Sequence, residues 1–271
     1  MFLLGRLPWR AIHERALSMV IFSLFVFGAI VGSFLNVCIL RIPGGESIVW
    51  PGSRCPSCKK PIAAYDNVPI LSWLLLRGRC RSCQAPISPR YWVVELLTAL
   101  AAVAVYFRVG FGFEWFVLFA FVASLIVITF IDLDHRIIPD VISLPGIVAG
   151  FVLSFAREPG PIDSAIGILF GGGILFVVAW GYEKATGREG MGGGDVKLLA
   201  MIGAFLGWQA IPFTLLVSSL SGSAIGLSLM WWTGSDSKYA IPFGPFLAFG
   251  ALVYVFCGAE LMRWYLGLSG I

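Results

Sequence analysis

The stretch "GMGGGDVKLLAMIGA", residues 190–204, begins as a glycine-rich turn and ends as an apolar helix. One carboxylate, Asp195, lies at the junction, directly after Gly192, Gly193 and Gly194. Glycine lets a backbone approach another chain closely and adopt angles that other residues avoid. A carboxylate at a membrane boundary carries a desolvation cost and is a candidate functional group. The stretch therefore indicates an apolar helix that begins at a candidate functional acid, and it raises the question of whether Asp195 has a partner.

The composition of the chain is that of a polytopic membrane protein. Of its 271 residues, 58% are hydrophobic and 13% are charged, whereas a soluble domain carries roughly 25% charged residues. The formal net charge of +4 is too small to indicate a nucleic-acid partner. We therefore expect the lipid bilayer to surround the chain and the basic residues to set its topology.

Apolar runs that cross a bilayer need about 20 residues. The fold class predicted is an all-α polytopic membrane protein with about eight transmembrane helices, the fourth and sixth of them short. We expect the helices at residues 17–40, 91–107, 113–131, 140–156, 164–182, 196–207, 209–232 and 241–262. The domains expected are an N-terminal segment with the first helix (1–40), an extramembrane domain (41–90) and a transmembrane domain (91–271). No internal sequence repeat is evident.

The orientation follows from the lysines and arginines, which are enriched in cytoplasmic loops. Eight of the nineteen basic residues lie in the 41–90 segment, which we therefore place in the cytoplasm. With eight crossings, the loops containing Arg136, Lys184, Arg188, Lys197 and Lys238 also face the cytoplasm. Thirteen basic residues then lie inside and six outside, and both termini face the opposite side.

This topology provides a partner for Asp195. The stretch "TFIDLDHRIIPD", residues 129–140, ends the third span on the cytoplasmic side, and Asp132 directly follows its apolar run. Asp132 and Asp195 are thus predicted at the same membrane depth, whereas Asp134 is expected in the loop. Asp140 precedes an apolar helix and is expected to be its N-cap. The alternative is that Asp132 and Asp195 are ordinary solvated residues at helix ends.

Two carboxylates held close together cannot both ionise cheaply, so the pair shares a proton. The ionised member can take a proton from water, which attacks a peptide carbonyl. The neutral member can donate to the carbonyl oxygen and later help the amine leave. The roles belong to the coupled pair and are not assigned to either residue. The three glycines would let a substrate backbone lie against the helix start. His135 and Arg136 are expected to serve as interfacial residues, as is Lys197, which is close enough in sequence to influence Asp195.

The two aspartate-containing stretches resemble the signature segments of the type IV prepilin peptidases, a bacterial branch of the G-x-G-D intramembrane aspartyl proteases. "GAIVGSFLNVCILRIP" at 28–43 is similar to the N-terminal motif of that family, and "IPFGPFLAFGA" at 241–251 to its C-terminal motif. The resemblance extends over nearly the whole chain. It implies that Asp132 and Asp195 are the paired catalytic aspartates of an aspartyl peptidase domain in residues 91–271.

Four of the six cysteines form two C-x-x-C pairs in the 41–90 segment, namely Cys55, Cys58, Cys80 and Cys83. Two such pairs at this spacing are typical of a tetrahedral zinc site of ribbon type. A segment of this size has little core of its own and gains stability from a metal. Disulfides or free thiols are the alternatives, but a cytoplasmic position disfavours disulfides. Four thiolates would fill the zinc coordination shell, so we expect a structural Zn²⁺ and not a hydrolytic one.

In the bifunctional members of the resembled family, a cysteine-rich domain accompanies N-methylation of the new N-terminal residue by S-adenosyl-L-methionine. The resemblance therefore implies both activities here. The "GGG" at 171–173 lies inside a span and is predicted to serve helix packing, not donor binding. Glu95, an acid near the start of the second span, is a candidate to contact the substrate amine or the methyl donor. The alternatives for Glu95 are that it extends to the interface or pairs with Arg90.

We interpret the chain as a bacterial inner-membrane enzyme with its aspartates and zinc domain on the cytoplasmic side. It would cleave the leaders of prepilins or pseudopilins of type IV pili or type II secretion and methylate the products. One alternative is a peptidase without methyltransferase activity. A second is an ion-coupled transporter, for which acids are expected near mid-span. A third is a membrane scaffold that binds a partner through its zinc domain.

Overall fold

The computed structural model describes residues 9–187, 192–233 and 242–268. Gly190 and Met191 of the glycine-rich stretch, and the basic residues Arg188 and Lys238, lie outside the described residues. Within these ranges the chain is almost entirely helical, and it has no strand apart from two isolated β-bridges. The prediction of an all-α fold is confirmed.

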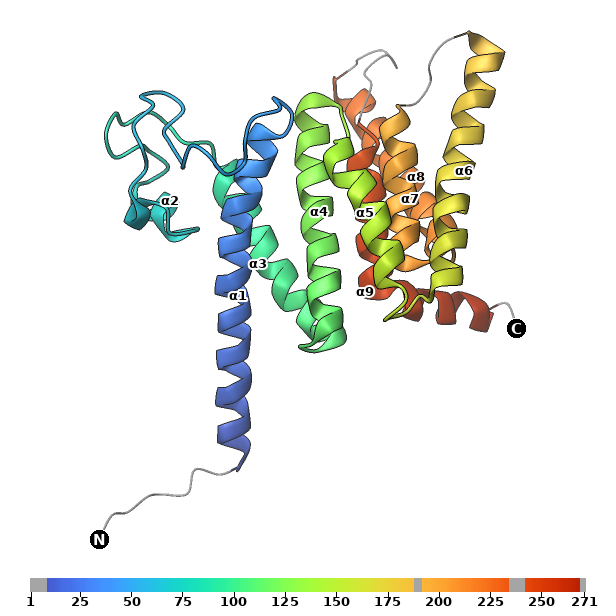
Figure 1. Cartoon of the computed structure of the whole chain (residues 1–271), viewed down its shortest axis with the longest axis horizontal. Coiled ribbons are helices and arrows are strands. Elements are labelled where there is room, and N and C mark those ends of the chain that lie inside the picture. The colour runs from blue at the N-terminus through green and yellow to red at the C-terminus, as the bar shows by residue number, and fades with distance from the viewer. Residues whose placement is uncertain (1–8, 188–191, 234–241, 269–271) are drawn as a thin grey trace. The chain divides into compact units, whose positions relative to one another are not determined.

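The long helices follow the predicted spans closely (Figure 1). They are α1 (Trp9–Arg41), α3 (Arg90–Val109), α4 (Phe113–His135), α5 (Asp140–Leu153), α6 (Pro161–Thr186), α7 (Gly193–Leu206), α8 (Ala210–Thr233) and α9 (Gly244–Leu268). The 41–90 segment contains a 3₁₀ turn, η1 (Ala64–Asp66), and the short helix α2 (Leu71–Leu75).

Five helices, α1, α3, α4, α6 and α8, are long and apolar enough to cross a membrane. Helices α5 and α7 have 14 residues each, fewer than the about 20 needed for a full crossing. The eight predicted helices therefore exist, five of them qualify as spans by length and composition, and crossing by the others stays a prediction.

Two local expectations are wrong. Helix α4 continues to His135, so Asp134 belongs to the helix and not to the loop. The N-cap of α5 is Pro139, and Asp140 is the first helical residue, which makes no capping bond. Helix α4 ends at His135, and the next residue, Arg136, has a φ of 56° that turns the chain out of the helix.

The chain divides into two compact units, one comprising Met1–Arg41 and Ser47–Trp115, the other Ile42–Glu46 and Phe116–Ile271. In the first unit α1 and α3 lie side by side (Figure 1). A Cβ atom on Gly28 would lie 2.7 Å from the Ala99 Cα, and one on Gly32 would lie 2.7 Å from the Glu95 Cα. Small residues at these positions let the two backbones meet, as is common between membrane helices.

In the second unit, α7 packs against α5 and α6 and is the most buried of these helices. Gly167 of α6 and Gly203 of α7 face each other so closely that neither could carry a side chain. A Cβ on Gly171 would lie 2.6 Å from the Leu199 carbonyl oxygen, which confirms the predicted packing role for this part of the 171–173 triplet. The Phe121 and Phe205 rings stack at 4.7 Å, so α4 and α7 share one apolar core.

Candidate active site and cysteine cluster

Asp132 lies in the last turn of α4 and is 5% exposed. Its Oδ2 accepts a hydrogen bond of 3.0 Å from the backbone amide of Gly244. Gly244 is the first residue of α9, and the first amides of a helix have no acceptor within the helix. Asp132 therefore provides the acceptor for this amide, and the bond holds the carboxylate in one orientation.

The absence of a side chain at Gly244 is a condition for this geometry. A Cβ atom there would lie 2.6 Å from Asp132 Oδ2 and 3.2 Å from its Cγ. Any other residue would have to displace the carboxylate or the start of α9. Gly244 lies in the stretch that resembles the family's C-terminal motif, but the sequence alone assigns this residue no role.

Asp195 lies in the first turn of α7 and is partly exposed. The charge of Asp132 reaches Asp195, so the two carboxyl groups lie within electrostatic range of each other. Among the described residues, the Asp195 side chain has no hydrogen-bond partner. One carboxylate is thus buried and oriented by the protein, while the other keeps its hydrogen-bonding capacity for water or a substrate.

The three glycines before Asp195 differ in their surroundings. A Cβ on Gly194 would lie 2.9 Å from the Ile138 Cβ, so this glycine is required by contacts within the protein. Among the described residues, and apart from chain neighbours and the helix's own backbone, no atom lies within 4 Å of a Cβ on Gly193, and none lies closer than 4.0 Å to one on Gly192. Both of these residues are exposed, so the backbone before Asp195 is open to a partner on this side.

Ile138 connects the starts of α7 and α9. It is 9% exposed, and its Cδ1 would lie 3.2 Å from a Cβ on Gly244, in addition to its contact with Gly194. Both helices that bear on the aspartate pair therefore begin with a glycine against the same side chain. Sequence reasoning missed Ile138, because an isoleucine between two helices carries no chemical signal of its own.

Lys197 and Asp140 form an ion pair between α7 and α5. The Lys197 Nζ lies 2.7 Å from Asp140 Oδ1 and 2.8 Å from Oδ2. Both side chains are exposed enough for water to screen the pair. The expected interfacial position of Lys197 is consistent with this exposure, and its ion-pair partner is Asp140.

The four cysteines come together as predicted. The Sγ atoms of Cys55, Cys58, Cys80 and Cys83 all lie within 4.8 Å of one another. The Cys55 and Cys83 sulfurs are 3.8 Å apart. Zn–S bonds of about 2.3 Å in a tetrahedron place sulfurs about 3.8 Å apart, so the cluster has the size and the donor set of a four-thiolate metal site.

The two halves of the cluster are built in the same way. In the first half the Cys55 amide donates to the Lys60 carbonyl and the Lys59 amide to the Cys55 carbonyl. In the second half the Cys80 amide donates to the Ala85 carbonyl, and the Gln84 amide donates to the Cys80 carbonyl. Lys59 and Gln84, the residues after each second cysteine, both have positive φ, 61° and 59°.

The expectation that the chain contains no internal repeat is therefore wrong at short range. Residues 54–62, "RCPSCKKPI", and 79–87, "RCRSCQAPI", share arginine, both cysteines, serine, proline and isoleucine at matching positions. Each copy closes with an antiparallel bridge between its arginine and its proline. Nine residues are too few to stand out in a search for domain-sized repeats, but the shared pattern was visible in the sequence.

The thiols of the cluster ionise unequally. The backbone amide of Cys58 donates to the Cys55 sulfur and, against the cost of burial, lowers the pKa of Cys55 to about 6. For Cys83 the amide of Ala85 favours the thiolate, but burial and the other cysteines raise the pKa to about 11. Four thiolates coexist at this distance when a cation balances their charge.

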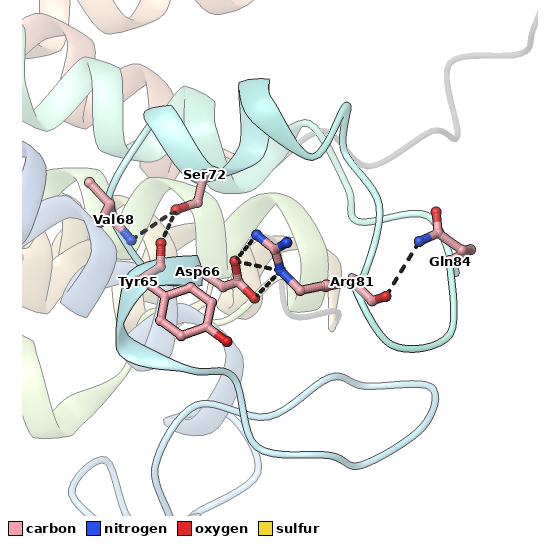
Figure 2. Close-up of polar contacts among 6 residues, drawn as sticks. All are labelled: Tyr65, Asp66, Val68, Ser72, Arg81 and Gln84. Carbon is pink, nitrogen blue, oxygen red and sulfur yellow. Dashed lines mark hydrogen bonds and ion pairs between the residues drawn. The ribbon is translucent and has the colours of Figure 1, made fainter.

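A network of polar contacts supports the second knuckle (Figure 2). The Arg81 guanidinium donates to both oxygens of Asp66 over 2.6 to 3.0 Å and lies over the Tyr65 ring. The hydrogen bonds from Arg81 lower the pKa of the Asp66 carboxyl. The Ser72 hydroxyl donates to the Tyr65 carbonyl and accepts from the Val68 amide, which ties the start of α2 to the same network.

Glu95 is a buried residue of α3 with partners on two sides. Its Oε2 accepts a 2.6 Å hydrogen bond from the Ile70 amide, and the carboxylate also receives a bond from the Ser33 side chain of α1. The sequence had suggested a contact with the substrate amine or the methyl donor, extension to the interface, or a pair with Arg90. The structure instead shows Glu95 joining α3, α1 and the residue that precedes α2.

Comparisons with known proteins agree on one family. Residues 26–109 match the bacterial peptidase A24 N-terminal domain, and residues 119–227 match the type IV leader peptidase family. A protein of Aeromonas hydrophila named prepilin leader peptidase/N-methyltransferase is 41% identical, with 90% of this chain and 93% of the relative aligned. Proteins of the same name from Pseudomonas aeruginosa and Xanthomonas campestris are 37% and 36% identical over 90% of this chain and 93% of each relative. No solved structure gives a significant match.

Proposed function

This chain belongs to the type IV leader peptidase family and is a membrane enzyme that cleaves prepilins and N-methylates the product, and we propose that Asp132 and Asp195 are its catalytic pair. The observation that carries the proposal is a buried Asp132 held by the Gly244 amide, with Asp195 from another helix within reach of its charge. The transporter and scaffold alternatives have no comparable support, since the related proteins are named as enzymes with both activities.

Peptide cleavage requires a nucleophilic water and a proton for the departing amine. In the proposed reaction the ionised member of the pair takes a proton from water as its oxygen bonds to the scissile carbonyl carbon. The neutral member donates a proton, first to the carbonyl oxygen. The member that took the proton from water then gives it to the amide nitrogen as the C–N bond breaks, and the other member takes a proton back from a hydroxyl of the tetrahedral intermediate. The leader leaves as a carboxylic acid and the mature pilin as an N-terminal amine. The roles belong to the pair and alternate during the cycle.

The exposed backbone at Gly192 and Gly193 supports a proposed place for the substrate. A segment without side chains next to a carboxylate allows an extended peptide to approach closely. The substrates would be prepilins, and by extension pseudopilins, whose short basic leader precedes an apolar helix held in the membrane. We place the aspartates on the cytoplasmic side of the bacterial inner membrane, in agreement with the excess of lysine and arginine in the 41–90 segment. Roles in type IV pili or type II secretion follow from this substrate class.

The four-cysteine cluster is proposed to hold a structural Zn²⁺. Its support is the all-sulfur donor set, the Cys55–Cys83 distance and the repeated knuckle. With four protein ligands, the ion would have no open position for water, so hydrolysis would depend on the aspartates. The domain that it stabilises would be residues 41–90, between the first helix and the 91–271 peptidase domain.

For methyl transfer, S-adenosyl-L-methionine is the proposed donor and would supply a methyl group on a sulfonium. The new pilin amine would form a bond to the methyl carbon as the S–C bond breaks, the thioether S-adenosylhomocysteine would leave, and the amine would lose a proton. Its unperturbed pKa of about 8 leaves much of it protonated at neutral pH, so a carboxylate that accepts this proton would help. Glu95 is our candidate for that carboxylate, and its burial beside α1 fits a group shielded from bulk water.

The test uses purified full-length enzyme, a prepilin, S-adenosyl-L-methionine and mass spectrometry of the products. Wild type should release the leader and add one methyl group to the mature N-terminus. An Asp195→Asn variant should leave intact prepilin unprocessed and unmethylated, since the acceptor amine does not exist before cleavage. The same variant should methylate a pilin supplied already cleaved. Loss of that second activity in a folded variant would show that one pair performs both reactions, contrary to the proposal.

A further inference from the structure

Helix α2 buries a polar residue and exposes its leucines, the reverse of a helix on the surface of a soluble domain. Ser72 is buried and makes hydrogen bonds inside the domain (Figure 2). Trp73 also points inward, where its Nε1 donates to the Ile87 carbonyl and its ring meets Trp92. Leu71, Leu74 and Leu75 are exposed, Leu75 to 82%. A helix that turns its serine inward and its leucines outward is suited to an apolar surrounding and not to water.

The attachment of α2 to α3 sets its depth relative to the membrane. The Ile70 amide, directly before α2, is bonded to Glu95. Glu95 is five positions after Arg90, the first residue of α3, which corresponds to about 7 Å along the helix axis. The residues Arg90, Tyr91 and Trp92 are of the types that anchor a span at the interface, so Glu95 and the start of α2 lie below that level.

The backbone at this attachment is strained, which indicates that the position is enforced. Ile70 has φ 63° and ψ −54°, and the Leu71 amide donates to the Pro69 carbonyl over 2.6 Å. This is a γ-turn with positive φ, a rare and strained conformation, and it is especially unfavourable for a β-branched residue. The Glu95 carboxylate compensates by binding the amide that this turn presents.

The charges around α2 match a lipid headgroup layer. The 41–90 segment carries eight lysines and arginines against two acids, Glu46 and Asp66. Arg77 and Arg79 follow the leucines directly and are exposed. Both ends of the segment are held at the membrane surface, because α1 ends at Arg41 and α3 begins at Arg90. Leucines followed by arginines are the arrangement of a segment that lies in the interface.

We propose that α2 is an interfacial helix, with Leu71, Leu74 and Leu75 inserted into the acyl layer of the leaflet next to Arg41 and Arg90, and Glu95 as the positioning residue that holds it there. The cysteine-rich domain then rests on the bilayer and does not project freely into water. In this arrangement the basic residues contact lipid headgroups, and the cluster of cysteines is held close to the membrane surface.

The experiment places a photoreactive residue, p-benzoylphenylalanine, at Leu75 in the full chain reconstituted in vesicles with anionic phospholipid, without prepilin. Matched variants carry it at Leu100, an exposed residue of the α3 span, and at Ser57, an exposed residue of the first knuckle. After irradiation, mass spectrometry should find a phospholipid adduct at Leu75 in a yield similar to that at Leu100, and little at Ser57. A yield at Leu75 as low as at Ser57, or cross-links there to a second copy of the chain instead of lipid, would overturn the proposal.

The role of Glu95 is tested in the same Leu75 variant by a matched pair of substitutions. Glu95→Gln keeps a carbonyl oxygen that can accept the hydrogen bond from the Ile70 amide, whereas Glu95→Leu removes the acceptor. Lipid labelling should persist with Gln and be lost with Leu, in protein that retains its metal content. Equal labelling in both would overturn the positioning role. Because no substrate is present, the result is independent of whether Asp132 and Asp195 cleave prepilins.

Discussion

The cysteine cluster and the aspartate pair each unite residues from two distant parts of the chain, but the chain builds them differently. The cluster is made twice from one local pattern, since residues 54–62 and 79–87 fold alike. The aspartate pair has no such redundancy: Asp132 ends one helix, Asp195 begins another, and Gly244 from a third orients the first acid. A local pattern defines the first site, and tertiary contacts define the second.

This difference determines what the sequence discloses. Metal ligands follow a spacing that a short peptide can satisfy, so the four cysteines could be identified from their positions alone. The acids could be paired from topology and family resemblance, but Gly244 and Ile138 could not, because their roles depend on how α7 and α9 pack. If this difference holds, the cysteine cluster should depend on its local sequence pattern and the aspartate pair on contacts between helices.

The largest effect is expected from Asp132→Asn and Asp195→Asn. Each change keeps the side-chain shape but removes an ionisable group, and general acid–base groups contribute roughly 10²–10⁴-fold to rate. Leader cleavage should fall by that factor or become undetectable. The double variant should be no worse than either single one, because the acids act as one unit. The measurement is the rate of leader release by purified enzyme.

Two nearby acids serve as controls for this prediction. Asp134→Asn changes an exposed residue of the same helix turn, and Asp140→Asn weakens the exposed ion pair with Lys197. Both variants should retain substantial activity. If Asp134→Asn were as inactive as Asp132→Asn, the pair would be wrongly assigned.

The next effect concerns the cysteine cluster. We expect about one zinc per chain in the wild type, and its complete loss when Cys55 and Cys58 are both replaced by Ser. Structural zinc contributes on the order of 10 kcal/mol in small domains, so residues 41–90 should become readily cleaved by added protease. Cys257→Ser, an exposed cysteine outside the cluster, is the control and should keep its zinc. Metal analysis that finds none in the wild type would contradict the zinc assignment.

Most helix ends were predictable to within about four residues, because each helix is an apolar run bounded by turn residues and charges. The exceptions are α1, which begins at Trp9 and not at 17, and α9, which ends at Leu268 and not at 262. The errors lie at ends, where single contacts decide. Asp134 entered α4 because the helix continues past its apolar run to the left-handed Arg136. Asp140 was expected to cap α5 but bonds to Lys197, a partner far away in sequence. For Glu95, the sequence showed the acid but not its hydrogen-bond donor, the Ile70 amide, because the position of that amide depends on a strained turn.

A smaller effect is expected from Gly244→Ala, which tests the tertiary construction of the aspartate pair. The new Cβ would lie 2.6 Å from Asp132 Oδ2, so the carboxylate must move. Misplacement of a catalytic group by about 1 Å can cost on the order of 10²-fold in rate, and we expect cleavage to fall roughly 10- to 100-fold. In the control Gly222→Ala, the Cβ would meet Phe246 at an ordinary 3.5 Å. Equal cleavage rates in Gly244→Ala and Gly222→Ala would show that Gly244 has no role in positioning Asp132.

The smallest effect tests whether the two knuckles are equivalent. Arg81 and Pro56 occupy the same position in the repeated pattern, yet Arg81 alone makes a two-point ion pair, with Asp66. The Arg81 side chain is exposed although that of Asp66 is only 11% exposed, and an ion pair that water reaches contributes little and is screened by salt. Arg81→Ala should therefore leave zinc content unchanged and make proteolysis of residues 41–90 modestly faster, by a margin that shrinks at high salt.

The sign of the pH dependence follows from Asp66. Because the hydrogen bonds from Arg81 lower the pKa of Asp66, the pair stabilises the folded segment above the ordinary carboxyl pKa. That contribution is lost as the pH falls through the lowered value. A double-mutant cycle with Arg81→Ala and Asp66→Asn isolates the pair, and Arg81→Lys should recover part of the effect because it keeps the charge without the two-point geometry. Loss of zinc in Arg81→Ala would mean that the second knuckle, unlike the first, needs a tertiary contact to hold its metal.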